Sequence, residues 1–216
     1  MKKHNLKWIC LLAGVLLSIM PLAAVMAGQG SALTYEQALT MVESDDLNQQ
    51  MDGVDAMVLS GDKRAGELLL RLFQDPKTDG VLKITVAYSL GVLGVESARD
   101  VLIAALEQDL EQRTGVWSGI IPALGELRSV AAVPVLLQAL NKRDDRWLGR
   151  EMAATALGQI GSTLAVPDLM TAAMLVDTRE PAIVALAAIG DGRAAAVFLD
   201  ALQEGEEPDV IRQATE

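Results

Sequence analysis

Apolar residues recur along most of the chain with the spacing of paired amphipathic helices. The clearest pair lies in residues 152–175, on either side of Gly161. Before this glycine, small or branched residues stand at positions i, i+3, i+4 and i+7, namely Ala153, Ala156, Leu157 and Ile160. After it they stand at i, i+4, i+7 and i+8, namely Ala165, Leu169, Ala172 and Ala173. This spacing predicts a helix, a glycine turn and a second helix that faces the first.

The same pair occurs five times, which indicates a repeat array. Successive copies, measured on one apolar position of the first helix, are 33, 34, 33 and 29 residues apart; that position holds Met57, Leu90, Leu124, Leu157 and Leu186. The copies span residues 46–76, 80–109, 115–142, 147–176 and 178–204, and a partial sixth copy spans 208–216. A pair of helices leaves apolar area on both flanks and needs neighbours of its own kind. The pattern therefore predicts an all-α fold, an α-solenoid of about five helix pairs.

One position of the second helix carries alanine in every copy. The five residues are Ala65, Ala98, Ala132, Ala165 and Ala194. A larger side chain between two crossing helices would force their axes apart. We therefore expect these alanines to be buried where the second helix of each copy crosses the first.

A linker and a cap helix precede the repeats, in residues 28–45. Thr34 and Gln37 have the spacing of a capping box, in which each side chain binds a backbone N–H of the first helical turn. The helix that starts there is expected to cover the open flank of the first copy.

The first 27 residues have the parts of a secretory signal peptide. Three lysines precede an uncharged apolar run, and Val25 and Ala27 place small residues at the −3 and −1 positions of a cleavage site. The sequence therefore predicts a periplasmic or secreted protein. The alternative is a membrane-anchored protein with an uncleaved N-terminal segment, because residues 8–27 are just long enough to span a bilayer.

Cleavage would remove the only cysteine, Cys10, and the only histidine, His4. Disulfides, Cys or His metal sites and His-based catalytic triads would then be unavailable. The three lysines of the leader would leave as well, so that 15 basic residues would face 29 acidic ones, a net charge of −14. This balance argues against nucleic acid and anionic lipid as partners, because both attract basic surfaces.

The residues of the fourth copy resemble a known repeat. Arg150 is followed by Ala153-Ala154-Thr155-Ala156-Leu157-Gly158-Gln159-Ile160-Gly161 and then by Ala165-Val166-Pro167. The second copy has Lys83, Leu90-Gly91 and Gly94 in the matching places, and the fifth has Arg179, Leu186 and Gly190. This pattern resembles the short HEAT-like repeat first described in the phycobilisome lyase family.

The resemblance covers residues 46–216, with two departures. Copy one has Met57-Val58 where others have Leu-Gly, and copy three has Pro122 inside its first helix, where a kink is expected. Members of this repeat class include bilin lyases, but most are scaffolds. The resemblance therefore implies HEAT-like helix pairs and protein binding, and it implies no catalytic residue and no cofactor.

The candidate partner site is the side of the second helices opposite their apolar stripe. Helical projection places these residues on the concave wall of the solenoid. They are Glu67, Arg71, Asp100, Glu107, Gln138, Asn141, Thr171 and Asp200. A plain solvated helix face explains the same pattern. Trp117 and Trp147 are possible aromatic anchors, although packing at a junction between copies explains them as well.

The acidic clusters lack the alternating Asp spacing and the glycine of a calcium loop, so no metal is expected. We therefore predict an exported, non-catalytic scaffold that binds a protein partner along its concave face. One alternative is a lyase-like protein or a protein that binds a small ligand such as a tetrapyrrole. Another is a structural subunit of an envelope assembly, which would self-associate through the C-terminal edge. The sequence does not identify the partner.

Overall fold

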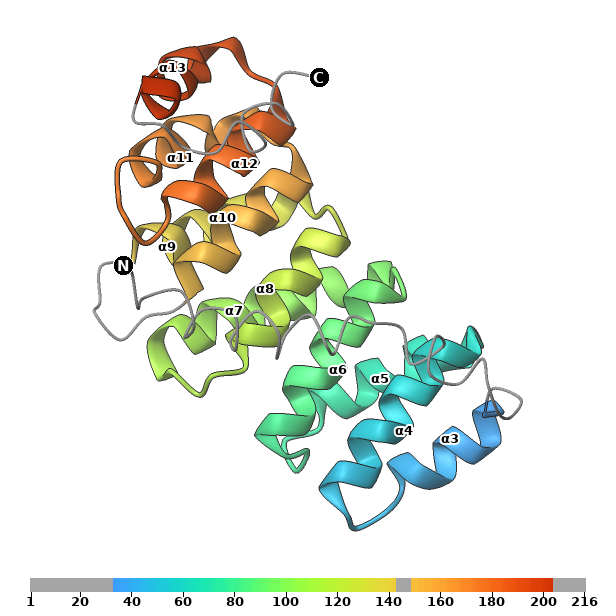
Figure 1. Cartoon of the computed structure of the whole chain (residues 1–216). Coiled ribbons are helices and arrows are strands. Elements are labelled where there is room, and N and C mark those ends of the chain that lie inside the picture. The colour runs from blue at the N-terminus through green and yellow to red at the C-terminus, as the bar shows by residue number, and fades with distance from the viewer. Residues whose placement is uncertain (1–32, 143–148, 204–216) are drawn as a thin grey trace, which may run out of the picture.

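The computed structural model describes residues 33–142 and 149–203, and within these ranges all regular structure is helical. Figure 1 shows the helices following one another in chain order as an elongated stack, from α3 at one end to α13 at the other. The α-solenoid predicted from the repeats is confirmed. The leader at residues 1–27, Trp147 and the partial sixth copy at 208–216 lie outside the described residues.

Two rows of helices make up the stack. The first helices of the five copies are α4 (Leu47–Ser60), α6 (Gly80–Val92), α8 (Trp117–Glu126), α10 (Gly149–Ile160) and α12 (Arg179–Ile189). The second helices are α5 (Arg64–Gln74), α7 (Arg99–Gln112), α9 (Val133–Asn141), α11 (Val166–Ala172) and α13 (Ala195–Gln203). Short 3-10 helices lead into four second helices: η1 (Glu96–Ala98), η2 (Val130–Ala132), η3 (Thr163–Ala165) and η4 (Gly192–Ala194).

Helix α3 (Tyr35–Val42) precedes the repeats and packs on α4. The predicted capping box is confirmed: the Gln37 backbone N donates to Thr34 Oγ1 at 3.3 Å, and the Thr34 backbone N donates to Gln37 Oε1 at 2.8 Å. On α4 the contact falls on Gly53, where a Cβ atom would lie 2.7 Å from the backbone N of Val42. Helix α3 thus covers the flank of α4 that no repeat covers.

The alanine in each second helix is completely buried, as predicted for Ala65, Ala98, Ala132, Ala165 and Ala194. Their predicted place at a helix crossing stays a prediction. Four of the five end the 3-10 turn that leads into the second helix, and the fifth, Ala65, lies in the first turn of α5. Each backbone N–H donates to the carbonyl three residues earlier, so a tight turn at every copy surrounds the small side chain.

The prediction that the two helices of one copy face each other also needs correction. Each second helix packs mainly against the first helix of the following copy: α5 on α6, α7 on α8, α9 on α10 and α11 on α12. The two helices within a copy contact each other much less. Periodicity shows which stripe of a helix is buried, but it does not show which neighbour covers that stripe.

Neighbouring first helices pack through the glycine of the Leu-Gly pair. A Cβ atom on Gly91 of α6 would lie 2.5 Å from the Cα of Ala123 in α8, and one on Gly158 of α10 would lie 2.7 Å from the Cα of Ala185 in α12. A Cβ on Gly125 of α8 would lie 3.1 Å from the Cα of Ala156 in α10. Glycine is therefore needed wherever two first helices approach this closely.

Replacing Gly158 tests this contact. We expect Gly158→Ala to destabilise the fold by about 1–3 kcal/mol, because the added methyl group must push α10 and α12 apart. Gly80→Ala is the matched control, since Gly80 starts α6 and a Cβ there meets nothing within 4 Å. Both variants replace a helical glycine with alanine, and the control should be neutral or stabilising by up to about 1 kcal/mol. Urea unfolding followed by circular dichroism measures both, and equal stability of the two variants would refute the contact.

Candidate functional site

The eight residues predicted to bind a partner are all exposed on the second helices. Neighbouring first helices lie closer together than neighbouring second helices do. The concave position of the eight residues stays a prediction. We call the surface that they form the second-helix face.

Three of the eight come together at one hollow. Glu107 of α7 and Gln138 and Asn141 of α9 line a space of about 560 Å³ between these two helices, with Leu110, Glu111 and Lys142. The Lys142 ammonium donates to the backbone carbonyl of Leu110 at 2.8 Å and so joins the ends of α7 and α9. We call this space the α7–α9 hollow. It presents amide and carboxylate groups around a gap into which a partner side chain can enter.

The other five residues are spread over α5, α7, α11 and α13, and some already have internal contacts. The Arg179 guanidinium lies 3.8 Å from an Asp200 carboxylate oxygen. The Thr171 hydroxyl donates to the Pro167 carbonyl at 3.1 Å. In the hollow itself, the Asn141 amide donates to Asp168 Oδ1 at 2.6 Å and links α9 to α11. These contacts hold part of the face in fixed geometry.

Trp117 begins α8 and is partly buried against the hydrophobic core. Its backbone N donates to Asp109 Oδ2 at 2.8 Å, and the Thr114 backbone N donates to Asp109 Oδ1 at 2.7 Å. Asp109 is only 3% exposed, so these N–H groups compensate a buried charge. This arrangement favours packing over a free aromatic anchor at Trp117. Sequence reasoning missed Asp109, because nothing in its spacing separates it from a solvated helix residue.

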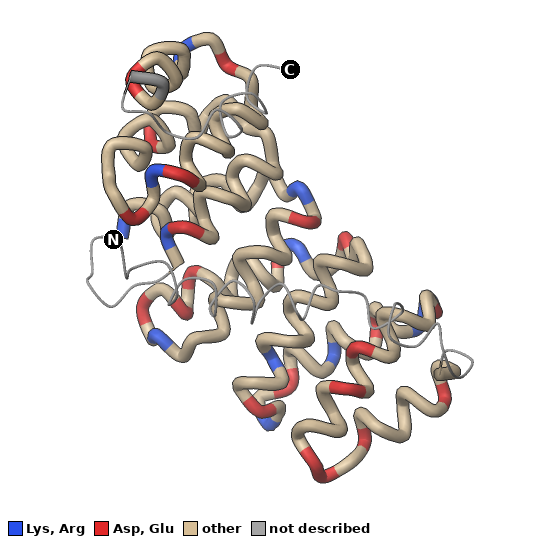
Figure 2. Tube along the Cα trace, viewed as in Figure 1, with Lys and Arg blue, Asp and Glu red and all other residues tan. Residues whose placement is uncertain are grey.

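The opposite side of the stack, which we call the first-helix face, carries acidic side chains on its exposed positions. They are Asp52, Asp55, Glu126, Glu151 and Glu180, and the exposed first-helix positions within the described ranges include no lysine or arginine. Figure 2 colours Asp and Glu red and Lys and Arg blue along the trace. Across the α8–α10 contact, the Gln159 amide donates to Glu126 Oε1 at 3.1 Å.

Partial burial and like charges raise the pKa of two carboxyls of this face. Burial, and then the charge of Asp52, raises the pKa of Asp55. Burial also raises the pKa of Glu151, and the charges of Asp177 and Glu180 add to the effect. The ionised forms of Asp55 and Glu151 are therefore disfavoured. A carboxyl whose pKa is higher in the folded chain than in the unfolded one destabilises the fold when it ionises.

This gives a pH-dependent prediction for Glu151. The destabilisation caused by ionised Glu151 is complete above the pKa of Glu151 in the folded chain. It disappears below the pKa of a glutamate in the unfolded chain, about 4.3. Because Glu151 is exposed, we expect Glu151→Gln to raise the free energy of unfolding by only roughly 0.5 kcal/mol at pH 7, and to have no effect at about pH 3.5. Urea unfolding at the two pH values measures the difference.

Glu67→Gln is the control, since Glu67 lies in the first turn of α5 as Glu151 lies in the first turn of α10, so both variants lose the same interaction of a negative charge with a helix N-terminus. It should give no gain at pH 7. A gain for Glu151→Gln that is the same at both pH values, or a loss at pH 7, would contradict the prediction.

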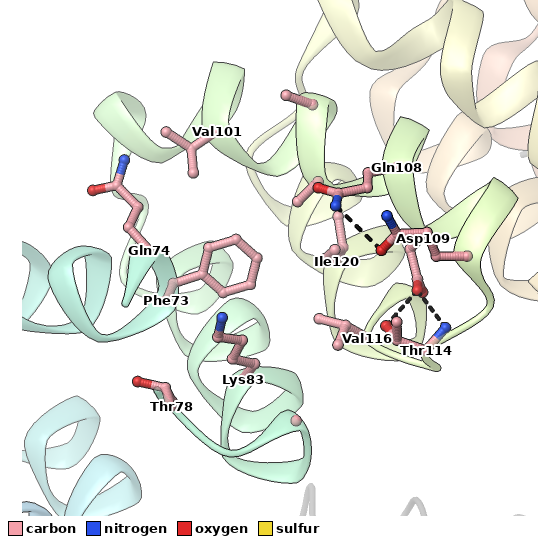
Figure 3. Close-up of a pocket in the computed structure, with 14 residues that line it drawn as sticks. Phe73, Gln74, Thr78, Lys83, Val101, Gln108, Asp109, Thr114, Val116 and Ile120 are labelled. Carbon is pink, nitrogen blue, oxygen red and sulfur yellow. Dashed lines mark hydrogen bonds between the residues drawn. The ribbon is translucent and has the colours of Figure 1, made fainter. Parts of the chain in front are cut away.

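A second hollow lies between α5, α6 and α7 and has a volume of about 600 Å³. Figure 3 shows Phe73, Gln74 and Lys83 on one side of it and Gln108, Asp109 and Thr114 on the other. We call it the Lys83 hollow. In the sequence Lys83 stands out only as a repeat residue, because a gap between two helices leaves no signal in the periodicity of either one.

The described residues include no group of three or more His, Cys, Asp or Glu side chains that could hold a metal ion. Within residues 33–142 and 149–203, no helix is both long and apolar enough to cross a bilayer.

Comparisons with known proteins agree with this architecture. Residues 116–179 match the HEAT repeats family, and no curated protein sequence matches the chain. Among solved structures, the complex of CpcE and CpcF of phycocyanin lyase from Nostoc sp. PCC7120 aligns with a TM-score of 0.63 at 20% identity, covering 86% of this chain and 76% of that chain. Human deoxyhypusine hydroxylase in complex with glycerol aligns with a TM-score of only 0.37 at 15% identity, covering 83% of this chain and 81% of that chain.

The family match lies on copies three and four, and the alignment with the Nostoc complex extends the likeness over most of the chain. The chain therefore contains HEAT repeats in residues 116–179, and its described residues have the fold of a HEAT-like, all-helical solenoid. At 20% identity, the likeness to the lyase subunits shows the fold alone.

Proposed function

We propose that this protein is an exported, non-catalytic scaffold that binds a protein partner on the second-helix face. The main support for this proposal is the α7–α9 hollow, which brings Glu107, Gln138 and Asn141 together. The first-helix row is closed by its glycine contacts, whereas the second-helix row opens between α7 and α9. A gap of this kind accepts a partner side chain, and the rigid stack keeps it preorganised.

Export rests on the leader at residues 1–27, whose removal would also remove Cys10 and His4. The processed chain would then bind its partner without thiol or imidazole chemistry. The similar Nostoc structure is itself a complex of two proteins, CpcE and CpcF, and this supports a protein partner for the present solenoid. A lyase-like activity would need reactive residues that the fold likeness does not supply.

Site-specific photo-crosslinking tests the proposal. A photo-crosslinking residue at Gln138 should form a discrete adduct with one protein of the native envelope fraction, because this side chain lines the α7–α9 hollow. The same residue at Thr155, which is exposed on α10 of the first-helix face, is the matched control and should form none. Gel shift and mass spectrometry of the purified adducts measure the outcome.

Adding Glu107→Lys to the Gln138 probe should reduce the adduct at least about tenfold, since it reverses one charge in the same hollow. Equal adducts from Gln138 and Thr155, or an adduct unaffected by Glu107→Lys, would refute partner binding at this surface. Secretion of the processed chain, checked by N-terminal sequencing of the exported protein, tests the leader separately.

The envelope-assembly alternative makes a different prediction. Self-association through the C-terminal edge would use α13, where Leu199 is 60% exposed. The residues that follow, 208–216, lie outside the described ranges. Light scattering of the processed chain should then show a dimer or larger species that reverts to monomer in a chain ending before Pro208. Monomer in both would remove this alternative.

A further inference from the structure

The Lys83 hollow has the size and walls of a small-molecule site. Its volume of about 600 Å³ lies within the roughly 300–1,000 Å³ typical of ligand pockets. The apolar part of its lining comes from three helices and the turn after α7: Phe73, Val101, Ala104, Ala105, Val116 and Ile120. Glutamine and threonine side chains complete the lining. An apolar ligand body would therefore be covered by both neighbouring second helices.

Lys83 departs from the structural role of its position in the repeat. In other copies this position ties the start of a first helix to the end of the preceding helix. The Gln50 amide donates to the Ser44 carbonyl at 2.7 Å, and Arg150 Nε donates to the Leu140 carbonyl at 3.1 Å. Arg179 likewise donates to the Ala173 carbonyl at 3.5 Å.

Lys83 forms no such bond and no ion pair with the part of the chain that the structure describes. In Figure 3 its side chain extends from α6 into the hollow beside Phe73. An ammonium group beside apolar side chains is poorly solvated and gains from an anionic partner.

The one other ionisable residue of the lining, Asp109, does not neutralise Lys83. Both of its carboxylate oxygens accept hydrogen bonds from the turn that starts α8, one from the Thr114 backbone N and hydroxyl and the other from the Trp117 backbone N. These donors compensate the aspartate within its own loop. The hollow therefore offers one uncompensated positive charge in a chain whose net charge is −11.

We propose that the Lys83 hollow binds a small molecule that consists of an apolar body and one carboxylate. The carboxylate pairs with the Lys83 ammonium, and the apolar body packs on the accessible apolar side chains of the lining, Val101, Ala104 and Val116. This site is separate from the α7–α9 hollow and adds a small ligand to the protein partner of the proposed function.

Decanoate, below its micelle concentration, is a direct probe. In ¹H–¹⁵N NMR titrations of the full chain, decanoate should shift the resonances of Val101, Ala104 and their neighbours saturably. Decyltrimethylammonium, with the same chain length and the opposite charge, should not. The acidic chain as a whole attracts cations, so a preference for the anion can come only from a local positive charge.

Two variants test separately how the Lys83 charge and the space in the hollow contribute to decanoate binding. Lys83→Gln should weaken decanoate binding at least about tenfold, as expected for loss of a charge-assisted contact, whereas Lys77→Gln, on an exposed lysine outside the lining, should leave it unchanged. Ala104→Phe, at an exposed position of the lining, fills the hollow and should abolish binding with Lys83 intact. Unchanged binding in Lys83→Gln, or equal binding of the two amphiphiles, would overturn the proposal. Unaltered thermal unfolding of the variants excludes misfolding as the cause.

Discussion

The structure depends on how closely its first helices can approach one another. Gly91, Gly125 and Gly158 stand where a Cβ atom would come within 2.5 to 3.1 Å of the Cα atom of the next first helix. Backbone therefore packs on backbone along this row, and each helix fixes the position of the next. The N-terminal end of the described stack keeps the same arrangement with other residues, since α3 packs on Gly53 of α4 in the way that a repeat would.

This close packing makes the two faces of the solenoid different. The first-helix row is sealed, and its exposed positions carry carboxylates that partial burial holds with raised pKa values at Asp55 and Glu151. The second helices are joined to the first row by tight turns around a buried alanine and lie further from one another. Hollows open between α5 and α7 and between α7 and α9 as a result. The recognition that we propose therefore depends on what fits between the second helices.

Much of the fold follows from local spacing. The alanine column, the capping box at Thr34 and the exposure of all eight second-helix residues could be predicted because each depends on a helical period or on neighbours within one turn. The neighbour against which each helix packs could not be predicted in this way. Helix α5 has the same amphipathic stripe whether it covers α4 or α6, and the structure shows that it covers α6.

The hollows were missed for the same reason, because they depend on the distance between helices and not on the pattern within one. Lys83 matches Arg150 and Arg179 in the repeat, and only coordinates show that the arginines bind carbonyls while the lysine enters a cavity. Asp109 was missed because its partners, at Thr114 and Trp117, lie in a turn whose path the sequence does not specify.

Small-angle X-ray scattering of the processed chain in solution tests the central claim most directly. Helices stacked through glycine contacts form an elongated particle, so the radius of gyration should lie clearly above the roughly 16 Å of a compact globule of this length. The pair-distance distribution should be skewed, with a long tail. A symmetric distribution with a radius of gyration near 16 Å would show that the helices do not form an extended array and would contradict the account.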